Sequence, residues 1–331
     1  MQVKRLMNTE TINSALRVVD RLITEECTAL HRCEPKGLYE PIAYILELGG
    51  KRLRPLLAYL TYEHFSGADF DLLQIEPIVK AVELFHNFTL LHDDLMDDAP
   101  VRRGQPTVYK KWGANTAILS GDAMMIESYK ALSQVDPSLL PRVLAIFNDM
   151  ATGVCEGQQL DMEYESKDLD AITIADYLGM IRLKTSYLFR GSMMMGALVA
   201  GLDNVALNTI ATAADRMGLA FQIMDDYLDV FSDKPDFGKV TGGDIVEGKR
   251  TWLLLKAYEL DPANLTVALG SESTEKRIAE VTQVYISNHV DRLALAEVDR
   301  LTEEAIEMLD SLDNPPIMIK SLFRALVQRI S

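Results

Sequence analysis

Two aspartate-rich pentads set in apolar helical sequence constrain this chain more than any other feature. The first runs from Asp93 to Asp97 within LLHDDLMDD, and the second runs from Asp225 to Asp229 within QIMDDYLD. On a helix, the first and last carboxylates of a DDxxD motif stand one turn apart on the same face. Several carboxylates in apolar surroundings are very unfavourable unless cations neutralise them. The two pentads are therefore predicted to form two walls of one metal site.

Magnesium is the metal that these residues favour. Carboxylates are hard oxygen ligands, and Mg²⁺ commonly binds through one or two carboxylates together with water and substrate phosphates. The ligand set has no histidine–cysteine spacing that would favour zinc. A single pentad is explained equally well as a solvated helix face. Both pentads have apolar neighbours, however, and these are Leu90, Leu91, Ile223 and Met224. Together they favour the metal site.

Composition limits the partners that this chain can bind. Its 331 residues are 48% hydrophobic, and its formal net charge is −16. Such an acidic surface argues against nucleic acid and anionic lipid as main partners. Three cysteines without a disulfide or zinc pattern favour a reducing compartment. There is no apolar run of membrane-spanning length and no signal-peptide core, so we expect a soluble cytoplasmic protein without stable membrane insertion.

The periodicity of apolar residues is helical almost throughout the chain. Pro55 is expected to restart a helix after Gly49-Gly50, and Pro77 to start the long helix that ends in the first pentad. The other helices are expected at about 9–31, 38–48, 114–133, 138–163, 172–201, 204–231, 251–260, 273–287, 290–312 and 316–330. No alternating strand pattern of useful length occurs. We predict one all-α domain over residues 1–331, with the active site in the core of a helical bundle.

Basic side chains gather in short groups near the pentads. The segment GGKRLRP at 49–55 joins a glycine turn and three cations to a helix start, which suits a diphosphate. Further basic positions near the two pentads are Arg102, Arg103, Lys184, Lys239 and Lys249. Each group alone is more often an exposed surface. Two groups beside acidic motifs indicate two diphosphates, one held through metal and one held directly.

The ordered set of motifs resembles the trans-polyprenyl diphosphate synthases, the family of farnesyl and geranylgeranyl diphosphate synthases. The matching segments are GGKRLRP, ELFHNFTLLHDDLMDDAPVRRG, SGDAMM at 120–125, CEGQQLD at 155–161, Lys184-Thr185, and FQIMDDYLD at 221–229 followed by Lys239. The resemblance implies an isoprenoid synthase-like bundle and a Mg²⁺-dependent, head-to-tail condensation of isopentenyl diphosphate with an allylic prenyl diphosphate. Residues before 40 and after 260 carry no motif that can be transferred.

The resemblance also implies roles for individual residues. Asp93 and Asp97 would hold two magnesium ions, and Asp225 would hold a third. The outer or water-mediated metal partners would be Asp94, Asp226 and Asp229. The allylic diphosphate would be held by Arg102, Lys184 and Lys239, and Lys249 is a further candidate for substrate binding. The residues that would hold isopentenyl diphosphate are Lys51, Arg54, His86 and Arg103.

The expected chemistry agrees with these roles. A diphosphate leaves an allylic carbon only if its growing negative charge is neutralised, which the magnesium ions, Arg102 and Lys184 would do. The Thr185 hydroxyl and the Gln222 carbonyl would face the developing carbocation, which needs dipoles and the exclusion of water. The proton is expected to leave with the departed diphosphate, because no side-chain base is well placed.

Product length is expected to depend on the helix that ends in the first pentad. Phe88 and Thr89 stand roughly 6–8 Å before Asp93 along that helix. An aromatic ring at position 88 would form a floor for the growing chain, and ordinary core packing explains the same residue. A floor predicts a short product, either geranylgeranyl or farnesyl diphosphate.

Three other readings remain open from the sequence. A class I terpene cyclase shares the first pentad and the fold, but its second metal motif normally differs from Asp225–Asp229 and it needs no GGKRLRP segment. A non-catalytic subunit of a prenyl synthase generally loses a pentad or the RRG arginines, which this chain keeps. The third is a helical scaffold that binds metal by chance. The family is usually homodimeric, so a homodimer is expected here.

Overall fold

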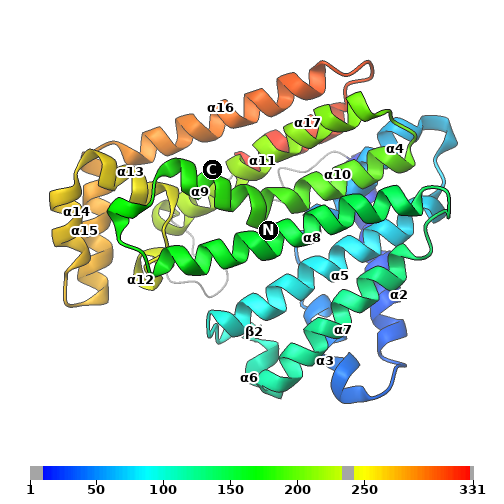
Figure 1. Ribbon diagram of the computed structural model, residues 1–331, viewed down its shortest axis with the longest axis horizontal. Coiled ribbons are helices and arrows are strands. Elements are labelled where there is room, and N and C mark those ends of the chain that lie inside the picture. Colours follow the sequence, from blue (N-terminus) through cyan, green and yellow to red (C-terminus); the bar gives the residue numbers. More distant parts are fainter. Residues whose placement is uncertain (1–9, 233–241, 329–331) are drawn as a thin grey trace.

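Helices make up nearly all of the molecule and mostly follow one long axis. The computed structural model describes residues 10–232 and 242–328. In its centre, α10 packs against α5, α8 and α11, and α11 packs against α16 (Figure 1). The helices are α2 (Glu10–Leu30), α3 (Lys36–Glu47), α4 (Leu53–Ser66), α5 (Leu72–Met96), α6 (Val108–Trp112), α7 (Ala114–Leu132), α8 (Leu140–Glu165), α9 (Ile174–Ile181), α10 (Tyr187–Val199), α11 (Asn204–Phe231), α12 (Gly243–Glu247), α13 (Trp252–Leu260), α14 (Pro262–Leu269), α15 (Thr274–Ser287), α16 (Val290–Asp310) and α17 (Ile317–Val327).

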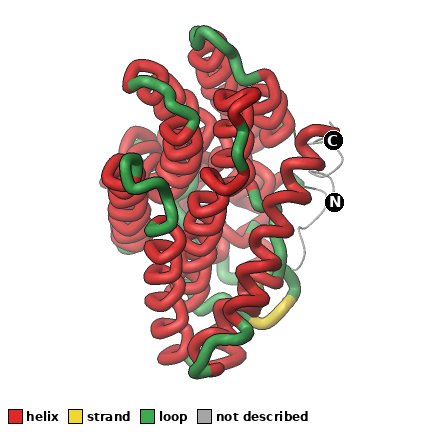
Figure 2. Tube along the Cα trace, turned by 90° about the vertical axis from the view of Figure 1, so that its right-hand side faces the viewer, coloured by secondary structure: helices red, strands yellow, loops and turns green. Residues whose placement is uncertain are grey.

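The remaining regular elements are short. Two 3₁₀ turns cover Gly67–Asp69 and Leu169–Ala171, and a π-helical segment, η3, covers Arg182–Ser186. Strands β1 (Val101–Arg102) and β2 (Gln105–Pro106) pair as an antiparallel hairpin shortly after α5, seen as the yellow tube in Figure 2. In the described part of the chain the sheet is limited to this hairpin. The all-α prediction is therefore confirmed.

Most of the expected helices are present, and two expectations need correction. Pro77 does not start α5, which begins before it because the Asp71 side chain accepts a hydrogen bond from Leu73 N at 3.0 Å. This cap stabilises an extra turn, and Pro77 then lacks one helical hydrogen bond in the second turn. The connection after α13, where no helix was expected, contains α14. Asp261 caps it and Pro262 occupies its first position, both of which favour a helix start.

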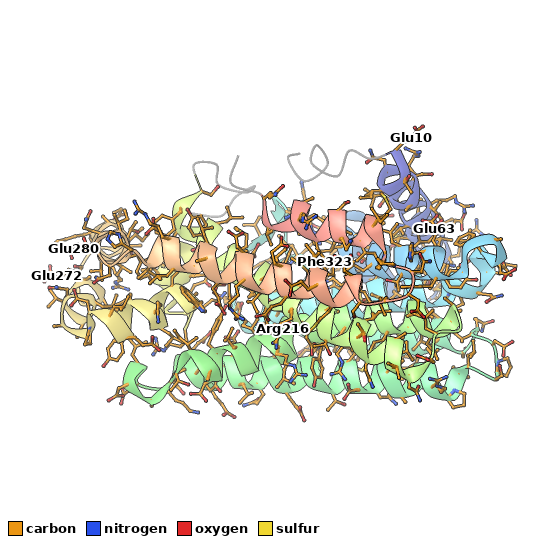
Figure 3. The ribbon with its side chains drawn as sticks, turned by 90° about the horizontal axis from the view of Figure 1, so that it is seen from above. Glu10, Glu63, Arg216, Glu272, Glu280 and Phe323 are labelled. Atoms are coloured by element: carbon orange, nitrogen blue, oxygen red, sulfur yellow. The ribbon has the colours of Figure 1, made fainter. Side chains whose placement is uncertain are left out.

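An apolar core continues through the bundle from Ile12 on α2 to Val327 on α17. Phe323 of α17 is fully buried in this core, and Arg216 of α11 pairs with Glu304 of α16 at 3.0 Å (Figure 3). Buried residues of α2 and of α17 thus belong to the same core cluster. Over residues 10–232 and 242–328, no helix has both the length and the apolar character that crossing a membrane requires.

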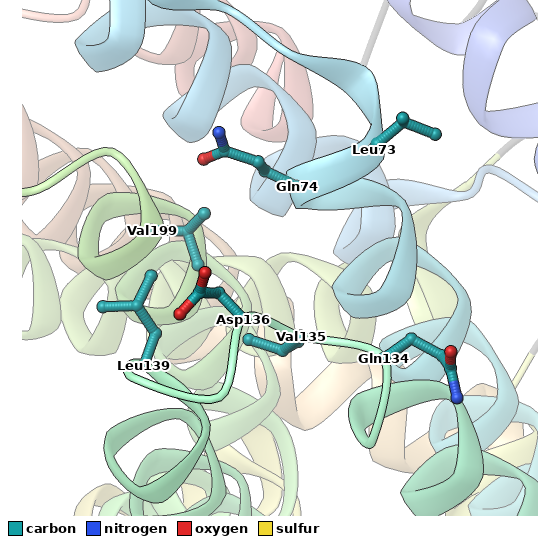
Figure 4. A pocket seen from close by; sticks show the side chains of 7 residues that line it. All are labelled: Leu73, Gln74, Gln134, Val135, Asp136, Leu139 and Val199. Carbon is teal, nitrogen blue, oxygen red and sulfur yellow. The ribbon is translucent and has the colours of Figure 1, made fainter.

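A cavity of about 190 Å³ lies between the start of α5, the α7–α8 connection and the end of α10 (Figure 4). Gln74 and Asp136 bring polar groups to its wall, and Leu139 and Val199 bring apolar ones. Gln74 precedes Asp93 by roughly 28 Å along α5, at the helical rise of 1.5 Å per residue. This cavity is therefore separate from the acidic motifs.

Candidate active site

The first pentad forms the last turn of α5 and divides its carboxylates between two environments. Asp94 is buried and forms a two-point ion pair with Arg102, whose Nε lies 2.8 Å from Oδ2 and whose terminal nitrogen lies 2.7 Å from Oδ1. Such a paired geometry is among the stronger side-chain interactions. The sequence predicted Asp94 as an outer metal partner and Arg102 as a ligand of the allylic diphosphate. In the structure the two side chains contact each other directly.

Asp93 and Asp97 repel each other in a partly buried setting. Burial, and after it the charge of Asp93, raises the pKa of Asp97 to about 6. Asp93 Oδ1 is buried and receives no hydrogen bond, and Lys184 Nζ lies 3.7 Å from it. Two carboxylates in this arrangement are stabilised by an added cation. Their oxygen-only chemistry fits Mg²⁺.

A π-helical turn places Lys184 and Thr185. Within η3, the backbone N–H of Tyr187 bonds to the carbonyl of Arg182, five residues earlier, so the turn is wider than an α-helical one. Two glycines accommodate it. A Cβ at Gly157 on α8 would lie 2.3 Å from the Lys184 backbone nitrogen, and a Cβ at Gly218 on α11 would lie within 2.6 Å of the Ser186 side chain and Cα.

Lys184 is held by two carboxylates from different helices. Its Nζ lies 2.5 Å from Asp161 Oδ2 on α8 and 3.7 Å from Asp93 Oδ1 on α5. Burial by itself would lower the pKa of Lys184, but the charges of Asp161 and Asp93 raise it above its usual value. Lys184 is therefore a firmly protonated cation beside the first pentad.

Thr185 and Gln222 meet in front of the second pentad. The Thr185 hydroxyl lies 3.1 Å from Gln222 Oε1, and Gln222 Nε2 donates to Asp226 Oδ1 at 3.0 Å. Asp226 Oδ2 accepts from the Tyr177 hydroxyl at 2.6 Å and from the Trp252 backbone at 3.3 Å. These bonds fix the Gln222 amide with its carbonyl toward Thr185. Burial, and after it the charge of Asp244, raises the pKa of Asp226 to about 8.

The other carboxylates of the second pentad differ in exposure. Asp225 is exposed, whereas Asp229 is half-buried. Asp229 Oδ2 accepts a hydrogen bond from the backbone N–H of Asp244 at 3.0 Å. Lys249 Nζ lies 2.8 Å from Glu247, 3.9 Å from Asp97 and 4.0 Å from Asp244. Lys249 thus connects the first pentad to the segment that binds Asp229. Lys239, predicted for the allylic diphosphate, lies outside the described residues.

The predicted groups for the second diphosphate lie around the start of α4. A terminal nitrogen of Arg103 donates to the carbonyl of Gly49, and a Cβ at Gly50 would lie 2.8 Å from the same guanidinium. Arg54 stacks on the ring of Phe189, with 5.3 Å to the centroid. Burial and then the charges of Arg54, Arg103, Arg102 and Arg52 hold the pKa of His86 well below its usual value. The charge of four arginines at one half-buried histidine indicates a strongly positive region. Lys51 is exposed beside it.

Phe88 belongs to a row of rings before the pentad. Its centroid lies 4.8 Å from that of His92 and 5.5 Å from that of Phe85. Gly121 of α7 lies against His92, where a Cβ would come within 2.2 Å of the ring. The Thr89 hydroxyl donates to the carbonyl of His86 at 2.8 Å, so it is used within the helix.

Four groups at the site were not predicted from the sequence. Asp161 lies in the quoted segment CEGQQLD, and its position could have been noted there. Tyr177, Asp244 and the backbone of Trp252 have no local motif and reach Asp226 or Asp229 only through the fold. Among residues 10–232 and 242–328, no three His, Cys, Asp or Glu side chains cluster closely enough to hold a metal by themselves.

Comparisons with known proteins agree with this architecture. The described structure is an all-α bundle with polar groups gathered at the ends of α5 and α11. The family model described as polyprenyl synthetase matches residues 35–286. A geranylgeranyl diphosphate synthase of Methanosarcina mazei is 35% identical over 287 residues, which is 85% of this chain and 86% of the relative. The chain therefore belongs to the polyprenyl synthetase family, and it is a prenyltransferase.

Solved structures have the same fold over nearly their whole length. A crystal structure of a geranylgeranyl pyrophosphate synthase has a TM-score of 0.88 and 37% identity, and the match covers 98% of this chain and 100% of that one. The corresponding enzyme of Corynebacterium glutamicum, crystallised with isoprenyl diphosphate and magnesium, has a TM-score of 0.87 and 25% identity over 96% and 99% of the two chains.

Proposed function

We propose that this enzyme condenses isopentenyl diphosphate head to tail with an allylic prenyl diphosphate in a Mg²⁺-dependent reaction that gives a short all-trans product. The observation that carries the proposal is the double connection between the pentads. Neighbouring residues on η3 lead to both of them. Lys184 lies 3.7 Å from Asp93, and Thr185 lies 3.1 Å from Gln222, which in turn donates to Asp226 of the second pentad at 3.0 Å. Lys249 lies near Asp97 and Asp244, the latter bonded to Asp229. A diphosphate between the pentads would meet both lysines.

Three magnesium ions per site are part of this proposal, with Asp93, Asp97 and Asp225 as the protein ligands. The buried Asp93 oxygen without a hydrogen bond and the raised pKa of Asp97 support a cation at the first pentad. Water and diphosphate oxygens would complete the coordination, as is usual for Mg²⁺. When bound, the metal ions would neutralise the charge that develops on the departing diphosphate. Asp94, Asp226 and Asp229 would interact with the magnesium ions indirectly, through water or through the neighbouring carboxylates.

The residues of the chain would then divide the remaining work. Lys184 would bind the departing diphosphate, and Arg102 would join it from the hairpin while it orients Asp94. The Thr185 hydroxyl and the Gln222 carbonyl would direct their dipoles at the allylic cation, which needs stabilising dipoles and no nucleophile. Isopentenyl diphosphate would occupy the positive region around His86. Lys51, Arg54 and Arg103 would hold its phosphates.

We propose geranylgeranyl or farnesyl diphosphate as the product. Phe88, His92 and Phe85 form a row of rings on the helix along which the chain would grow. The relative in Methanosarcina mazei is named geranylgeranyl diphosphate synthase, which supports a product of this size. The hydroxyl of Thr89 is bonded within α5, so Phe88 is the stronger candidate for the floor.

The enzyme is further proposed to be a cytoplasmic homodimer. Three free thiols, Cys27, Cys33 and Cys155, support a reducing compartment. The apolar side chains of Ile118, Leu119 and Ile126 are exposed on α7, at 44%, 60% and 59%, which supports a second copy packing there. Sedimentation of the purified protein at several concentrations tests the dimer.

A direct assay tests the proposed function and its alternatives. Purified enzyme is incubated with Mg²⁺, labelled isopentenyl diphosphate and geranyl diphosphate, and products are separated by mass spectrometry. Elongated prenyl diphosphate is expected. Cyclic hydrocarbon would support a terpene cyclase, and no turnover a non-catalytic subunit. The double variant Asp93→Asn with Asp225→Asn is expected to abolish elongation, so retained activity in this variant would refute the proposed site.

A further inference from the structure

Arg52 lies inside the basic segment at 49–55, yet its side chain points into the protein. Only 7% of that side chain is exposed, and it contacts three helices. One terminal nitrogen donates to Glu83 Oε1 on α5 at 2.5 Å, and the other donates to the carbonyl of Leu46 on α3 at 2.7 Å. Its Nε lies 3.5 Å from Asp20 on α2. Arg52 therefore joins the start of α4 to α2, α3 and α5.

Glu83 anchors the other end of this contact. It is 2% exposed, and its Oε1 also accepts a hydrogen bond from Asn87 Nδ2 at 2.9 Å. His86 follows Glu83 by three residues, so both lie on one side of α5. The Arg52–Glu83 pair thus fixes the start of α4 relative to the part of α5 that carries His86.

The backbone at Arg52 needs such contacts. Its φ of 47° is in the left-handed region, which is unfavourable for a side chain larger than glycine. Gly49 and Gly50 also have positive φ, at 75° and 150°, and the Gly49 carbonyl accepts a hydrogen bond from Arg103. A strained conformation of this kind persists where surrounding structure determines it. Here the guanidinium of Arg52 supplies that structure.

Stability alone does not account for a buried ion pair, because apolar replacements of similar volume are often equally stable. Its value here is geometric. We propose that Arg52 is a positioning residue for isopentenyl diphosphate, acting through Glu83 and the Leu46 carbonyl without touching the substrate. The side chains whose relative placement it fixes are Lys51, Arg54, His86 and Arg103. This inference rests on the proposed function for the identity of the ligand.

The shape of the guanidinium is central to this role. Arg52 uses separate nitrogens for Glu83 and for the Leu46 carbonyl, which a planar fork can reach together. A lysine carries the same charge on a single nitrogen. Arg52→Lys therefore keeps the positive potential near the diphosphate and loses the fixed geometry, whereas Arg52→Met loses both.

Lys80 provides a matched control on the same helix. It lies three residues before Glu83 and pairs with Glu76 at 2.9 Å and with Glu26 of α2 at 3.5 Å. Its side chain is 19% exposed. Lys80→Met therefore removes an ion pair between α2 and α5 without touching the basic segment.

The test compares Michaelis constants for the two substrates in wild type, Arg52→Lys, Arg52→Met, Glu83→Gln and Lys80→Met. The KM for isopentenyl diphosphate is expected to rise about tenfold or more in both Arg52 variants, the loss that follows from one misplaced charge-assisted hydrogen bond. The KM for geranyl diphosphate is expected to stay within about twofold, because the Asp93 and Asp225 motifs are unchanged. Glu83→Gln is expected to raise the KM for isopentenyl diphosphate as well. Lys80→Met is expected to leave the KM of both substrates unchanged.

Calorimetric titration with isopentenyl diphosphate in the absence of Mg²⁺ provides a readout that does not depend on turnover. Wild type is expected to bind, and Arg52→Lys to bind about tenfold more weakly. If wild type binds isopentenyl diphosphate but does not produce an elongated prenyl diphosphate, the proposed function is refuted, whereas the role of Arg52 in binding still stands. Arg52→Lys with unchanged affinity, or an equal rise of both Michaelis constants, would overturn the positioning role. If Arg52→Met fails to fold, Arg52→Lys and Glu83→Gln decide the question.

Discussion

Gly157 allows α8 to approach η3 closely enough to set the position of Lys184. A Cβ at this residue would lie 2.3 Å from the Lys184 backbone nitrogen and 2.7 Å from its Cα, while ordinary contact begins at 3.4 Å. Gly157→Ala therefore forces α8 and η3 apart by about 1 Å, because the atoms it meets are backbone and cannot rotate away. The expected cost to folding is about 1–3 kcal/mol, the range for overpacked cores.

The same displacement acts on catalysis. Lys184 Nζ lies 2.5 Å from Asp161 and 3.7 Å from Asp93, so a shift of about 1 Å alters both contacts. Misplacement of this size can cost about a hundredfold in rate, and we expect kcat of Gly157→Ala to fall by one to two orders of magnitude, that is about 10- to 100-fold. Steady-state elongation assays give kcat, and urea unfolding followed by circular dichroism gives the change in stability.

Gly179 is the matched control. It lies exposed on α9, shortly before η3, and a Cβ there would meet nothing within 4 Å. Gly179→Ala is expected to raise stability by about 0.5–1 kcal/mol through helix propensity and to leave kcat unchanged. If Gly157→Ala matches Gly179→Ala in kcat and stability, the close approach of α8 does not position Lys184 and the reasoning fails.

Three further predictions concern Phe88, Tyr177 and His86. Phe88→Ala is expected to lengthen the product, as measured by mass spectrometry. Phe323→Leu, at another buried position on α17, is expected to leave the product unchanged, and identical products from both variants would reject the floor. Tyr177→Phe is expected to lower kcat about tenfold because the buried Asp226 side chain loses its 2.6 Å hydrogen bond, and an unchanged kcat would contradict a role for this bond. Burial, then the surrounding arginines, lowers the pKa of His86, so the unfolded chain takes up a proton below pH 6.5 that the folded chain does not. When the pH falls from 7.5 to 5.5, the free energy of unfolding of wild type should decrease by about 1 kcal/mol more than that of His86→Gln. Equal decreases in chemical unfolding experiments would contradict a neutral His86 in the folded protein.

The helices were predictable because their signals are local. Apolar spacing and end residues identify α11 and α16 without any tertiary information. Pro77 misled the prediction for α5 because the decisive signal was the side chain of Asp71, six residues earlier. The helix after α13 was missed although Asp261 and Pro262 are a capping pair, because the segment is short and weakly amphipathic.

Motifs identify candidate residues for the site, but the geometry among these residues does not follow from the sequence. The segment 172–201 has the pattern of a continuous helix, and nothing in its own sequence indicates the π turn at Arg182–Ser186. That turn depends on Gly157 and Gly218, which come from two other helices. The bond from Tyr177 to Asp226 likewise joins residues that are far apart in the sequence. Long-range packing of this kind leaves no trace in a local pattern.

Three cations beside the pentads are already paired with carboxylates of the chain. Arg102 is paired with Asp94, Lys184 with Asp161, and Lys249 with Glu247. A buried cation without a partner would be costly, so these carboxylates stabilise the lysines and arginine in place. A diphosphate that binds here must share these cations with their carboxylate partners or replace those partners. The gain in binding free energy is therefore smaller than for a new ion pair with an unpaired cation. Removing Asp161 should therefore tighten the hold of Lys184 on an anion while it weakens the folded protein. Asp161→Asn is expected to bind pyrophosphate more tightly in calorimetry and to unfold at a lower urea concentration, and a loss of both affinity and stability would show that Asp161 serves only to place Lys184.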